Sequence, residues 1–403
     1  MTREDVARPA DTCSSTDAYT PHGVFLCPGR VTVTGVRVRT RGGLSLDLDD
    51  LTVEVVTVAP ATRILDFLRA GRGARIVSAM HHDQPYRDPQ HCDVLHLRVA
   101  DETGTYPALY SADFLTGETV PWRGNMVDEV VRQWGNGCLV QIMFHVSPPQ
   151  YRVDEEAAGG WGTDAAEETL RAPNRVYSYL TEQRWHDLFT PGSWLHENWV
   201  ERLDEYGRHL ARLKQAGVTV LLRPFHEMNQ HVFWWGGRPG ATGTAALFRW
   251  MRRHFEERFG LDNVIWVWNV QDLPDDYGHV DGDEKFARYR GLDGGLAPYD
   301  ADDWDAFNPG ADAYDILSVD FYDDEGFSPR RYAQAKRIAE RDGKPFIIGE
   351  TFRLPHPEVL RDQPDWALAM PWGIRTWRYN TEEEMVDFYR HSIGAADLPR
   401  FVA

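Results

Sequence analysis

The sequence predicts an α/β protein built as a (β/α)8 TIM barrel with a short N-terminal β-rich extension. Between residues 61 and 391, apolar strand-like runs alternate with amphipathic segments about eight times. No glycine-rich phosphate loop follows any of these runs, which argues against a doubly wound nucleotide-binding fold. Polar or aromatic residues recur where the predicted strands end, and a barrel gathers those ends in one mouth. They are His81, Asp113, His145, Glu227, Asn269, Tyr322, Glu350 and Trp377.

Residues 1–60 form the predicted extension and residues 61–403 the predicted barrel domain. Apolar and polar residues alternate from 30 to 58 around a pair of glycines, which is typical of short antiparallel strands. The N-terminus lacks the apolar core of a signal peptide, and no apolar run is long enough to cross a membrane. Cytoplasmic residence and export followed by trimming both stay open.

The barrel elements follow from the apolar patterns along the chain. The predicted strands and strand-like segments cover residues 75–80, 93–99, 106–113, 138–144, 218–225, 263–269, 316–322, 345–349 and a last segment at 373–377. The predicted helices carry one apolar face each and cover residues 61–70, 126–134, 194–215, 244–259, 329–341 and 381–391. Residues 148–192 are rich in Gly, Pro and Trp and predict a loop insertion, in which Trp161 and Trp185 line a groove or pack locally.

Composition narrows the possible partners. A net charge of −19 and a pI of about 5.2 argue against nucleic acid or an anionic membrane. The 15 tryptophans suit a glycan site, although large rings also fill cores. We expect a monomer that needs no metal or other cofactor. The four cysteines have no metal-ligand spacing, and Cys92 and Cys138 are expected to be buried thiols.

The stretch at residues 218–237, VTVLLRPFHEMNQHVFWWGG, concentrates the chemistry. A buried apolar strand runs directly into Arg223, His226, Glu227 and Asn229, and Trp235 follows. The C-terminal end of a parallel strand is where α/β enzymes place catalytic residues. Carboxylates supply acid and base, and flat rings stack on pyranoses. Glu227 has a bland alternative as a helix N-cap partner, but a buried glutamate is costly unless it is paired or used.

Glu350 ends the seventh predicted strand, so in a closed barrel its carboxyl faces that of Glu227, which ends the fourth. Glycoside hydrolysis needs an acid on the leaving oxygen and a carboxylate at the anomeric carbon. A gap of about 5–5.5 Å gives retention and one of about 6.5–9.5 Å gives inversion. Aromatic surroundings favour Glu227 as the acid, and a hydrogen bond from Tyr322 would hold Glu350 as the nucleophile. The alternatives for Glu350 are a helix N-cap and an ion pair with Arg223.

These motifs resemble glycoside hydrolase family 26, a β-mannanase family of the retaining (β/α)8 clan. RPFHEMN followed by FWWG, at residues 223–236, resembles the acid/base motif of that family. IIGE at 347–350 is similar to its nucleophile strand, and SVDFY at 318–322 to its sixth strand. TYPALYSAD at 105–113 resembles the second strand. The resemblance covers approximately residues 75–400.

The resemblance implies a retaining hydrolase of β-1,4-mannosidic linkages in a polysaccharide or oligosaccharide, with Glu227 as acid/base and Glu350 as nucleophile. It implies that His145, His226 and Tyr322 contact the sugar or orient Glu350. Trp377 is similar to the aromatic platform after strand eight, and Trp372 is its rival. The expected substrate-binding residues are His145, Arg223, His226, Asn229, Trp235, Tyr322 and Trp377.

The chain departs from the family pattern after the acid/base motif. Family members commonly read HEMNG with an aromatic residue two positions on, where this chain has Gln230 and Val232. One stacking ring is therefore missing, and mixed-linkage β-glucan or β-1,3-xylan stays open as the substrate.

A non-catalytic carbohydrate-binding barrel is a further alternative, which the presence of both glutamates argues against. A metal hydrolase built on His81-His82 is disfavoured because adjacent residues point to opposite sides of a strand. Endo and exo action both stay open, since the insertion at 148–192 can close one end of a groove.

Overall fold

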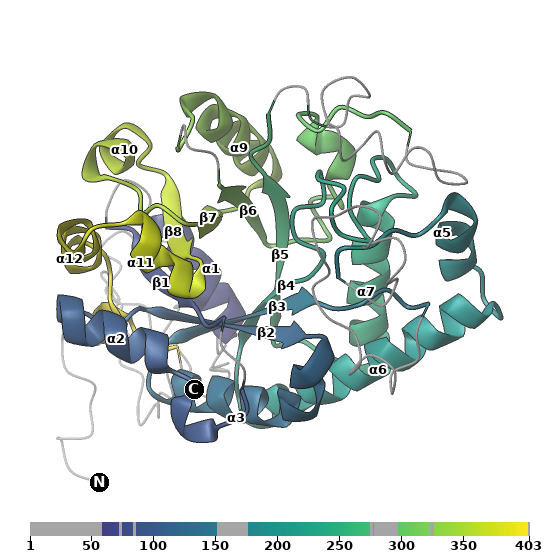
Figure 1. Ribbon diagram of the computed structural model, residues 1–403, viewed down its shortest axis with the longest axis horizontal. Coiled ribbons are helices and arrows are strands. Elements are labelled where there is room, and N and C mark those ends of the chain that lie inside the picture. Colours follow the sequence, from purple (N-terminus) through teal and green to yellow (C-terminus); the bar gives the residue numbers. More distant parts are fainter. Residues whose placement is uncertain are drawn as a thin grey trace, which may run out of the picture.

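The computed structural model describes residues 59–71, 75–83, 86–150, 176–274, 277, 297–322 and 326–401, and they form a closed barrel of eight parallel strands (Figure 1). The strands are β1 (Val77–His81), β2 (Leu109–Leu115), β3 (Leu139–His145), β4 (Val220–Arg223), β5 (Val264–Gln271), β6 (Ile316–Phe321), β7 (Phe346–Thr351) and β8 (Trp366–Pro371). Each strand pairs with the next in the chain, and β8 closes the barrel by pairing with β1. The predicted barrel is confirmed, whereas the antiparallel strands predicted at 30–58 lie outside the described residues.

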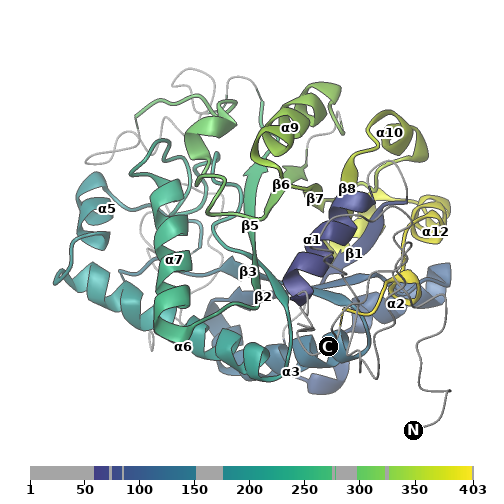
Figure 2. The ribbon, with the colours of Figure 1, turned by 180° about the vertical axis from the view of Figure 1, so that it is seen from behind.

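Helices surround the barrel on its outer side (Figures 1 and 2). They are α1 (Pro60–Ala70), α2 (Val94–Thr103), α3 (Arg123–Gly135), α5 (Glu182–Leu188), α6 (Trp194–Gln215), α7 (Thr244–Phe259), α9 (Pro329–Asp342), α10 (Pro357–Asp362), α11 (Thr376–Tyr379) and α12 (Glu382–His391). The bounds of α6 and α7 coincide with the predicted helices. No helix within the described ranges is long and apolar enough to cross a membrane.

Local sequence signals explain where these helices begin and end. The Ser193 hydroxyl accepts a hydrogen bond from the His196 backbone N–H at 3.1 Å and so caps α6. At the start of α12, Thr381 and Glu384 form a reciprocal capping box. Helix α7 ends at Gly260, whose φ of +59° is a left-handed conformation that glycine adopts without strain. These signals fix the lengths of the connections between strands.

The core lies inside the barrel and between the strands and the helices. Every residue of β1 to β4 and of β6 to β8 is buried, because helices cover the outer face of the parallel sheet. Much of the tryptophan content fills this core, as the fully buried rings of Trp199, Trp266, Trp268 and Trp304 do. Both thiols within the described residues, Cys92 and Cys138, are free and buried, as predicted.

The eighth strand lies earlier in the chain than predicted. It covers Trp366–Pro371, whereas the sequence prediction placed a last segment at 373–377. The apolar run WALAM pairs with β7 and β1, and the chain then turns at Gly373, which has a φ of +52°. Trp372 therefore follows the strand directly, and Trp377 falls in the short helix α11.

Candidate active site

The loop after β4 presents Glu227 through an unusual backbone. Phe225 and Glu227 both have a φ of +51°, a left-handed conformation that non-glycine residues rarely adopt. The Asn269 side-chain oxygen, at the mouth end of β5, accepts a hydrogen bond from the Glu227 backbone N–H at 2.5 Å. The Met228 N–H donates to the Asn269 carbonyl at 3.3 Å. Contacts with the neighbouring strand thus hold a strained backbone at the residue expected to act as the acid.

Glu350 lies beside Asp320 because the register between β6 and β7 shifts there. Val319 pairs with Ile348, but Asp320 pairs with Glu350, so Gly349 is skipped in the ladder. A Cβ atom on Gly349 would collide with the Ser318 hydroxyl and lie 2.6 Å from the Asp320 Oδ1 atom. Only glycine lets the two carboxyl-bearing strands approach this closely.

Replacing Gly349 with Ala should therefore disturb the site and the fold together. We expect a loss of about 1–3 kcal/mol in unfolding free energy from overpacking, and at least a tenfold lower kcat, because a displacement of about 1 Å misaligns the carboxyls. Urea unfolding and steady-state kinetics measure both quantities. Gly135→Ala is the matched control, since its Cβ would meet nothing within 4 Å. A wild-type kcat in Gly349→Ala would contradict the view that the close approach of these two carboxyl-bearing strands matters for activity.

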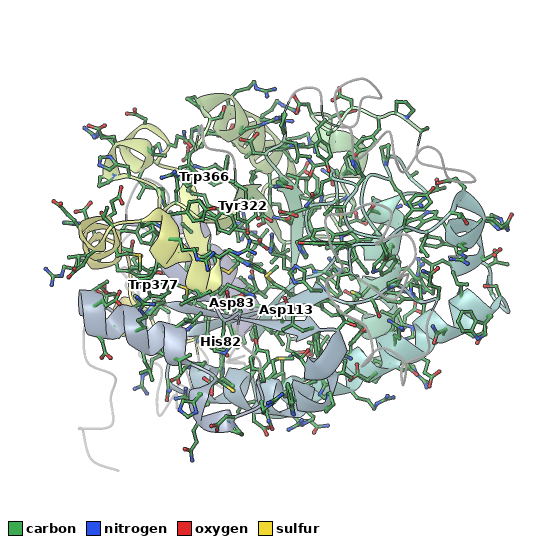
Figure 3. The ribbon with its side chains drawn as sticks, in the orientation of Figure 1. His82, Asp83, Asp113, Tyr322, Trp366 and Trp377 are labelled. Carbon is green, nitrogen blue, oxygen red and sulfur yellow. The ribbon has the colours of Figure 1, made fainter. Side chains whose placement is uncertain are left out.

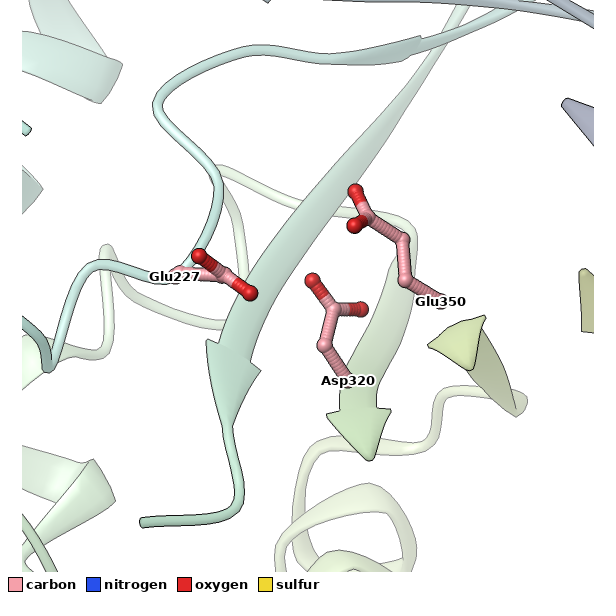
Figure 4. Close-up of side chains that lie close together, drawn as sticks. All are labelled: Glu227, Asp320 and Glu350. Carbon is pink, nitrogen blue, oxygen red and sulfur yellow. The ribbon is translucent and has the colours of Figure 1, made fainter. Parts of the chain in front are cut away.

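Three buried carboxyls meet at the centre of the site (Figure 4). One oxygen each from Glu227, Asp320 and Glu350 lie within 4.8 Å of one another. The fully buried Arg223 donates hydrogen bonds to Asp320 Oδ2 and Glu350 Oε1, and the Tyr322 hydroxyl donates to Glu350 Oε2. Carboxylates at this spacing also suit a hard cation. We assign no metal, because Arg223 already engages one oxygen of two of the three carboxyls.

Burial and neighbouring charges shift the pKa values of Glu227, Asp320 and Arg223. Burial, together with the charges of Asp320 and Glu350, raises the pKa of Glu227 well above its ordinary value. Burial also raises the pKa of Asp320, although Arg223 acts in the opposite direction. The raised pKa of Glu227 favours retention of a proton, which a general acid requires. Burial disfavours the Arg223 cation, but Asp320 and Glu350 outweigh it and raise the pKa of Arg223.

A pocket of about 650 Å³ opens above the carboxyls. It is lined by His81, Asp83, Leu115, His145, Tyr177, His226, Glu227, Gln230, Val232, Phe233, Gln271, Tyr322, Glu350, Phe352, Trp372 and Arg375. The indole of Trp372 stacks on the His81 ring with centroids 3.9 Å apart. The His145 ring lies edge-on to that of His226 at 4.3 Å, and its Nδ1 atom bonds the Asp113 carboxylate. The combination of flat rings, imidazoles and carboxyls suits a sugar ring bound over the acid pair.

Five of the predicted site residues line this pocket. They are Glu227, Glu350, His145, His226 and Tyr322. Burial, and then nearby His145 and Arg223, lower the pKa of His226 well below its usual value, which favours the neutral ring. Arg223 lies beneath the pocket and reaches it only through the carboxyls. The proposed ion pair of Glu350 with Arg223 and its hydrogen bond from Tyr322 are both present, so these two interpretations do not exclude each other.

The other three predicted residues lie away from the pocket lining. The Asn229 amide donates to the carbonyls of Gln271 and Ala301 at 2.8 and 3.0 Å, so it joins two loops. The Trp235 indole N–H donates to the His226 carbonyl at 2.8 Å, and its ring supports Phe233 from behind at 4.6 Å. Both residues shape the acid loop without facing the pocket.

Trp377 is placed differently from the prediction. Its indole N–H donates to Glu102 Oε2 at 2.6 Å, and the Arg98 guanidinium lies 4.1 Å from its ring centre. Both partners belong to α2, so Trp377 lies outside the barrel (Figure 3). The rival residue, Trp372, lines the pocket. The indole N–H of Trp185 donates to the Thr242 carbonyl, which supports its local-packing interpretation, and Trp161 lies outside the described residues.

The two tryptophans give a matched pair of variants. Trp372→Ala should raise KM for a soluble oligosaccharide about tenfold, the loss expected for one stacking ring. Trp377→Ala removes a ring of equal size outside the pocket and should leave KM within about twofold. Initial-rate kinetics on the same oligosaccharide compare them. Equal effects from both variants would show that Trp372 is not the platform.

Asp320, His81, Gln230 and Phe233 lie in the site but were not predicted as site residues. Asp320 carried a usable signal, because it stands two positions before Tyr322 on one strand and side chains two apart share a face. His81 stood at a predicted strand end, but nothing in the sequence placed it against Trp372. The side-chain contact between Gln230 and Glu227 depends on the fold of the loop.

The closed barrel and the facing carboxyls at its mouth define a (β/α)8 protein with a paired-carboxyl site of the kind that glycoside hydrolases use. The model of glycosyl hydrolase family 26 matches residues 54–392. The chain belongs to this family, as the motifs predicted.

Relatives of known name agree with this membership. Mannan endo-1,4-beta-mannosidase A of Piromyces sp. is 24% identical over 374 residues, which cover 89% of this chain and 52% of that protein. This chain thus spans about half the length of that curated relative. The structure of GH26A from Muricauda sp. is 26% identical, with a TM-score of 0.69 over 85% of this chain and 98% of that one. A beta-mannanase from a symbiotic protist of the termite Reticulitermes speratus, complexed with gluco-manno-oligosaccharide, shares the fold at 20% identity, with a TM-score of 0.64 over 85% of this chain and 95% of that one.

Proposed function

We propose that this chain is a retaining glycoside hydrolase that cleaves β-1,4-mannosidic linkages in mannan-type polysaccharides, with Glu350 as nucleophile and Glu227 as acid/base. One observation carries the proposal. One oxygen of each carboxyl lies within 4.8 Å of the other at the base of an aromatic pocket. So close an approach favours direct attack on the sugar over the arrangement of an inverting enzyme, whose carboxyl groups stand about 6.5–9.5 Å apart to leave room for water.

The surroundings of the two glutamates support different roles. The raised pKa of Glu227 favours a protonated carboxyl that protonates the leaving oxygen. Glu350 accepts hydrogen bonds from Arg223 and Tyr322, which orient a carboxylate towards the anomeric carbon. Attack by Glu350 forms a glycosyl ester as the glycosidic bond breaks. Glu227, now ionised, then takes a proton from the water that hydrolyses this ester.

The mannan assignment draws on the relatives' names, among them the mannosidase of Piromyces sp. and the beta-mannanase complexed with gluco-manno-oligosaccharide. One feature of the pocket favours a second candidate. Val232 lines the wall near Glu227 where the family pattern commonly has an aromatic ring. The same mechanism acting on mixed-linkage β-glucan or β-1,3-xylan is therefore the alternative.

The test is reducing-sugar release from β-mannan, galactomannan, mixed-linkage β-glucan and β-1,3-xylan, with the anomeric form of the first product followed by NMR. Release from the mannans with a β-configured first product supports the proposal. Release only from the glucan or the xylan would leave the proposed two-glutamate mechanism in place and would change the proposed substrate to that polysaccharide. An α-configured first product would overturn the double displacement, and retained binding without release would favour a binding protein.

A further inference from the structure

Gln230 stands three residues after Glu227 and turns back onto it. Its backbone N–H donates to the Glu227 carbonyl at 3.0 Å, which closes a tight turn. The residue is 8% exposed and lines the pocket. Its amide nitrogen donates a hydrogen bond to Glu227 Oε2. The residue is thus a neighbour of the acid both along the chain and in space.

Backbone contacts hold Gln230 in place within the loop. A Cβ atom on Gly236 would collide with the Gln230 carbonyl oxygen, so the two backbones are in close contact. The Gly237 N–H donates to the Met228 carbonyl at 2.9 Å and closes the loop on the side of the acid. The loop thus fixes the backbone from which the Gln230 side chain reaches Glu227 Oε2.

We propose that Gln230 is a positioning residue that places the acid proton of Glu227 on Oε1 and stabilises the carboxylate left after that proton departs. This inference rests on the proposed function, in which Glu227 is the acid/base. The amide nitrogen donates to Oε2, and a carbonyl-type oxygen accepts such a bond better than the hydroxyl oxygen of a protonated carboxyl, so the bond favours a proton on Oε1. In the cleavage step the Oε1–H bond breaks, the leaving oxygen takes the proton, and the amide remains bonded to the anion.

The charged groups that face Glu227 act on its anion in opposite directions. Asp320 on β6 and Glu350 on β7 disfavour a second negative charge, whereas Arg223 on β4 favours it. A neutral donor on Oε2 adds to the stabilisation of the anion without changing the charge of the site. Because Glu227 must act as an acid in one step and as a base in the next, such a donor keeps both protonation states within reach.

The test uses Gln230→Met, which keeps length and volume but removes the donor. The substrate is the polysaccharide that the wild type cleaves in the reducing-sugar test. Because the Glu227 carboxylate loses a hydrogen bond, its pKa should rise, and the alkaline limb of the kcat/KM profile should move upward by about one pH unit. At the wild-type optimum kcat/KM should fall about tenfold. For a dinitrophenyl glycoside, whose leaving group needs no proton, it should stay within about twofold. Gln230→Asn keeps the amide but is one methylene too short, and should move the limb in the same direction.

Two controls distinguish the positioning role of Gln230 from the acid/base role of Glu227 on which it rests. Gln271→Met changes another glutamine of the pocket lining and should leave the alkaline limb in place. Glu227→Ala with azide should regain cleavage of the dinitrophenyl glycoside, since azide replaces the water that needs a base. Failure of that rescue overturns the acid/base role itself. If azide rescue succeeds, three results for the Gln230 variants would overturn only the positioning role. They are an alkaline limb of kcat/KM that does not move, a limb that moves downward, and equal losses on the polysaccharide and the dinitrophenyl glycoside.

Discussion

Glu350→Gln should lower kcat at least about 10⁴-fold, the scale on which removal of a catalytic nucleophile acts. The amide keeps the volume of the side chain but cannot form the glycosyl ester. Arg223 and Tyr322 both donate to Glu350, so one of them will face the amide NH₂ group. We therefore expect some loss of stability, with oligosaccharide binding retained within about tenfold. Stopped assays over long times measure kcat, and calorimetry measures binding.

Asp320 is the carboxyl that competes for the nucleophile assignment, because it shares the same 4.8 Å cluster. A 2-fluoro glycoside with an activated leaving group should trap the wild-type enzyme as an ester on Glu350, identified by peptide mass spectrometry. The matched variant Asp320→Asn should still form that ester. An adduct on Asp320, or kcat of Glu350→Gln within a hundredfold of wild type, would reverse the assignment.

Arg223→Met should be the most destabilising single change at the site. The guanidinium is fully buried and pairs with Asp320 and Glu350, which are themselves buried. Removing one partner from such a cluster leaves uncompensated charge and typically costs about 3–5 kcal/mol in unfolding free energy. Urea unfolding measures the difference. Arg212→Met, which breaks an exposed pair with Asp128, is the control and should cost less than about 1 kcal/mol.

The loss in Arg223→Met should depend on pH. Burial raises the pKa of Asp320 and Arg223 lowers it, so without the cation the folded-state pKa of Asp320 lies further above its unfolded value. The variant is therefore penalised most above the unfolded pKa values, where folding must bury charged carboxylates or take up protons. As the pH falls through that range, the unfolded chain also becomes protonated and the difference from wild type shrinks. A difference that grows towards low pH would contradict the ion-pair account.

Much of the fold was predictable because its signals are local and repeated. The apolar runs of β4 and β7 and the amphipathic pattern of α6 each identify an element on their own. The prediction of the eighth strand was wrong because two candidate segments lie close together in the sequence. The run at 366–371 follows a short helix, and the sequence alone did not show that the chain turns at Gly373.

The site was predictable to the extent that strand ends carry it. Glu227, Glu350 and Tyr322 line one pocket, as expected from a barrel that brings those strand ends together. The spacing of Asp320 to Tyr322 could have placed it at the mouth, but its closeness to Glu350 depends on the skipped Gly349, a register shift that no periodicity reveals. Asn229 and Trp235 lie in the right loop, yet their side chains turn towards backbone partners.

The left-handed backbone at Phe225 and Glu227 has a consequence for protein engineering. Each such residue costs about 1–3 kcal/mol relative to an unstrained conformation, and glycine removes that cost. Glu227→Gly also deletes a buried acid, so we expect it to melt above the wild type while being inactive, which calorimetry would reveal. Directed evolution scored on heat resistance alone would therefore accumulate inactive variants at this loop, and turnover has to be selected in the same round.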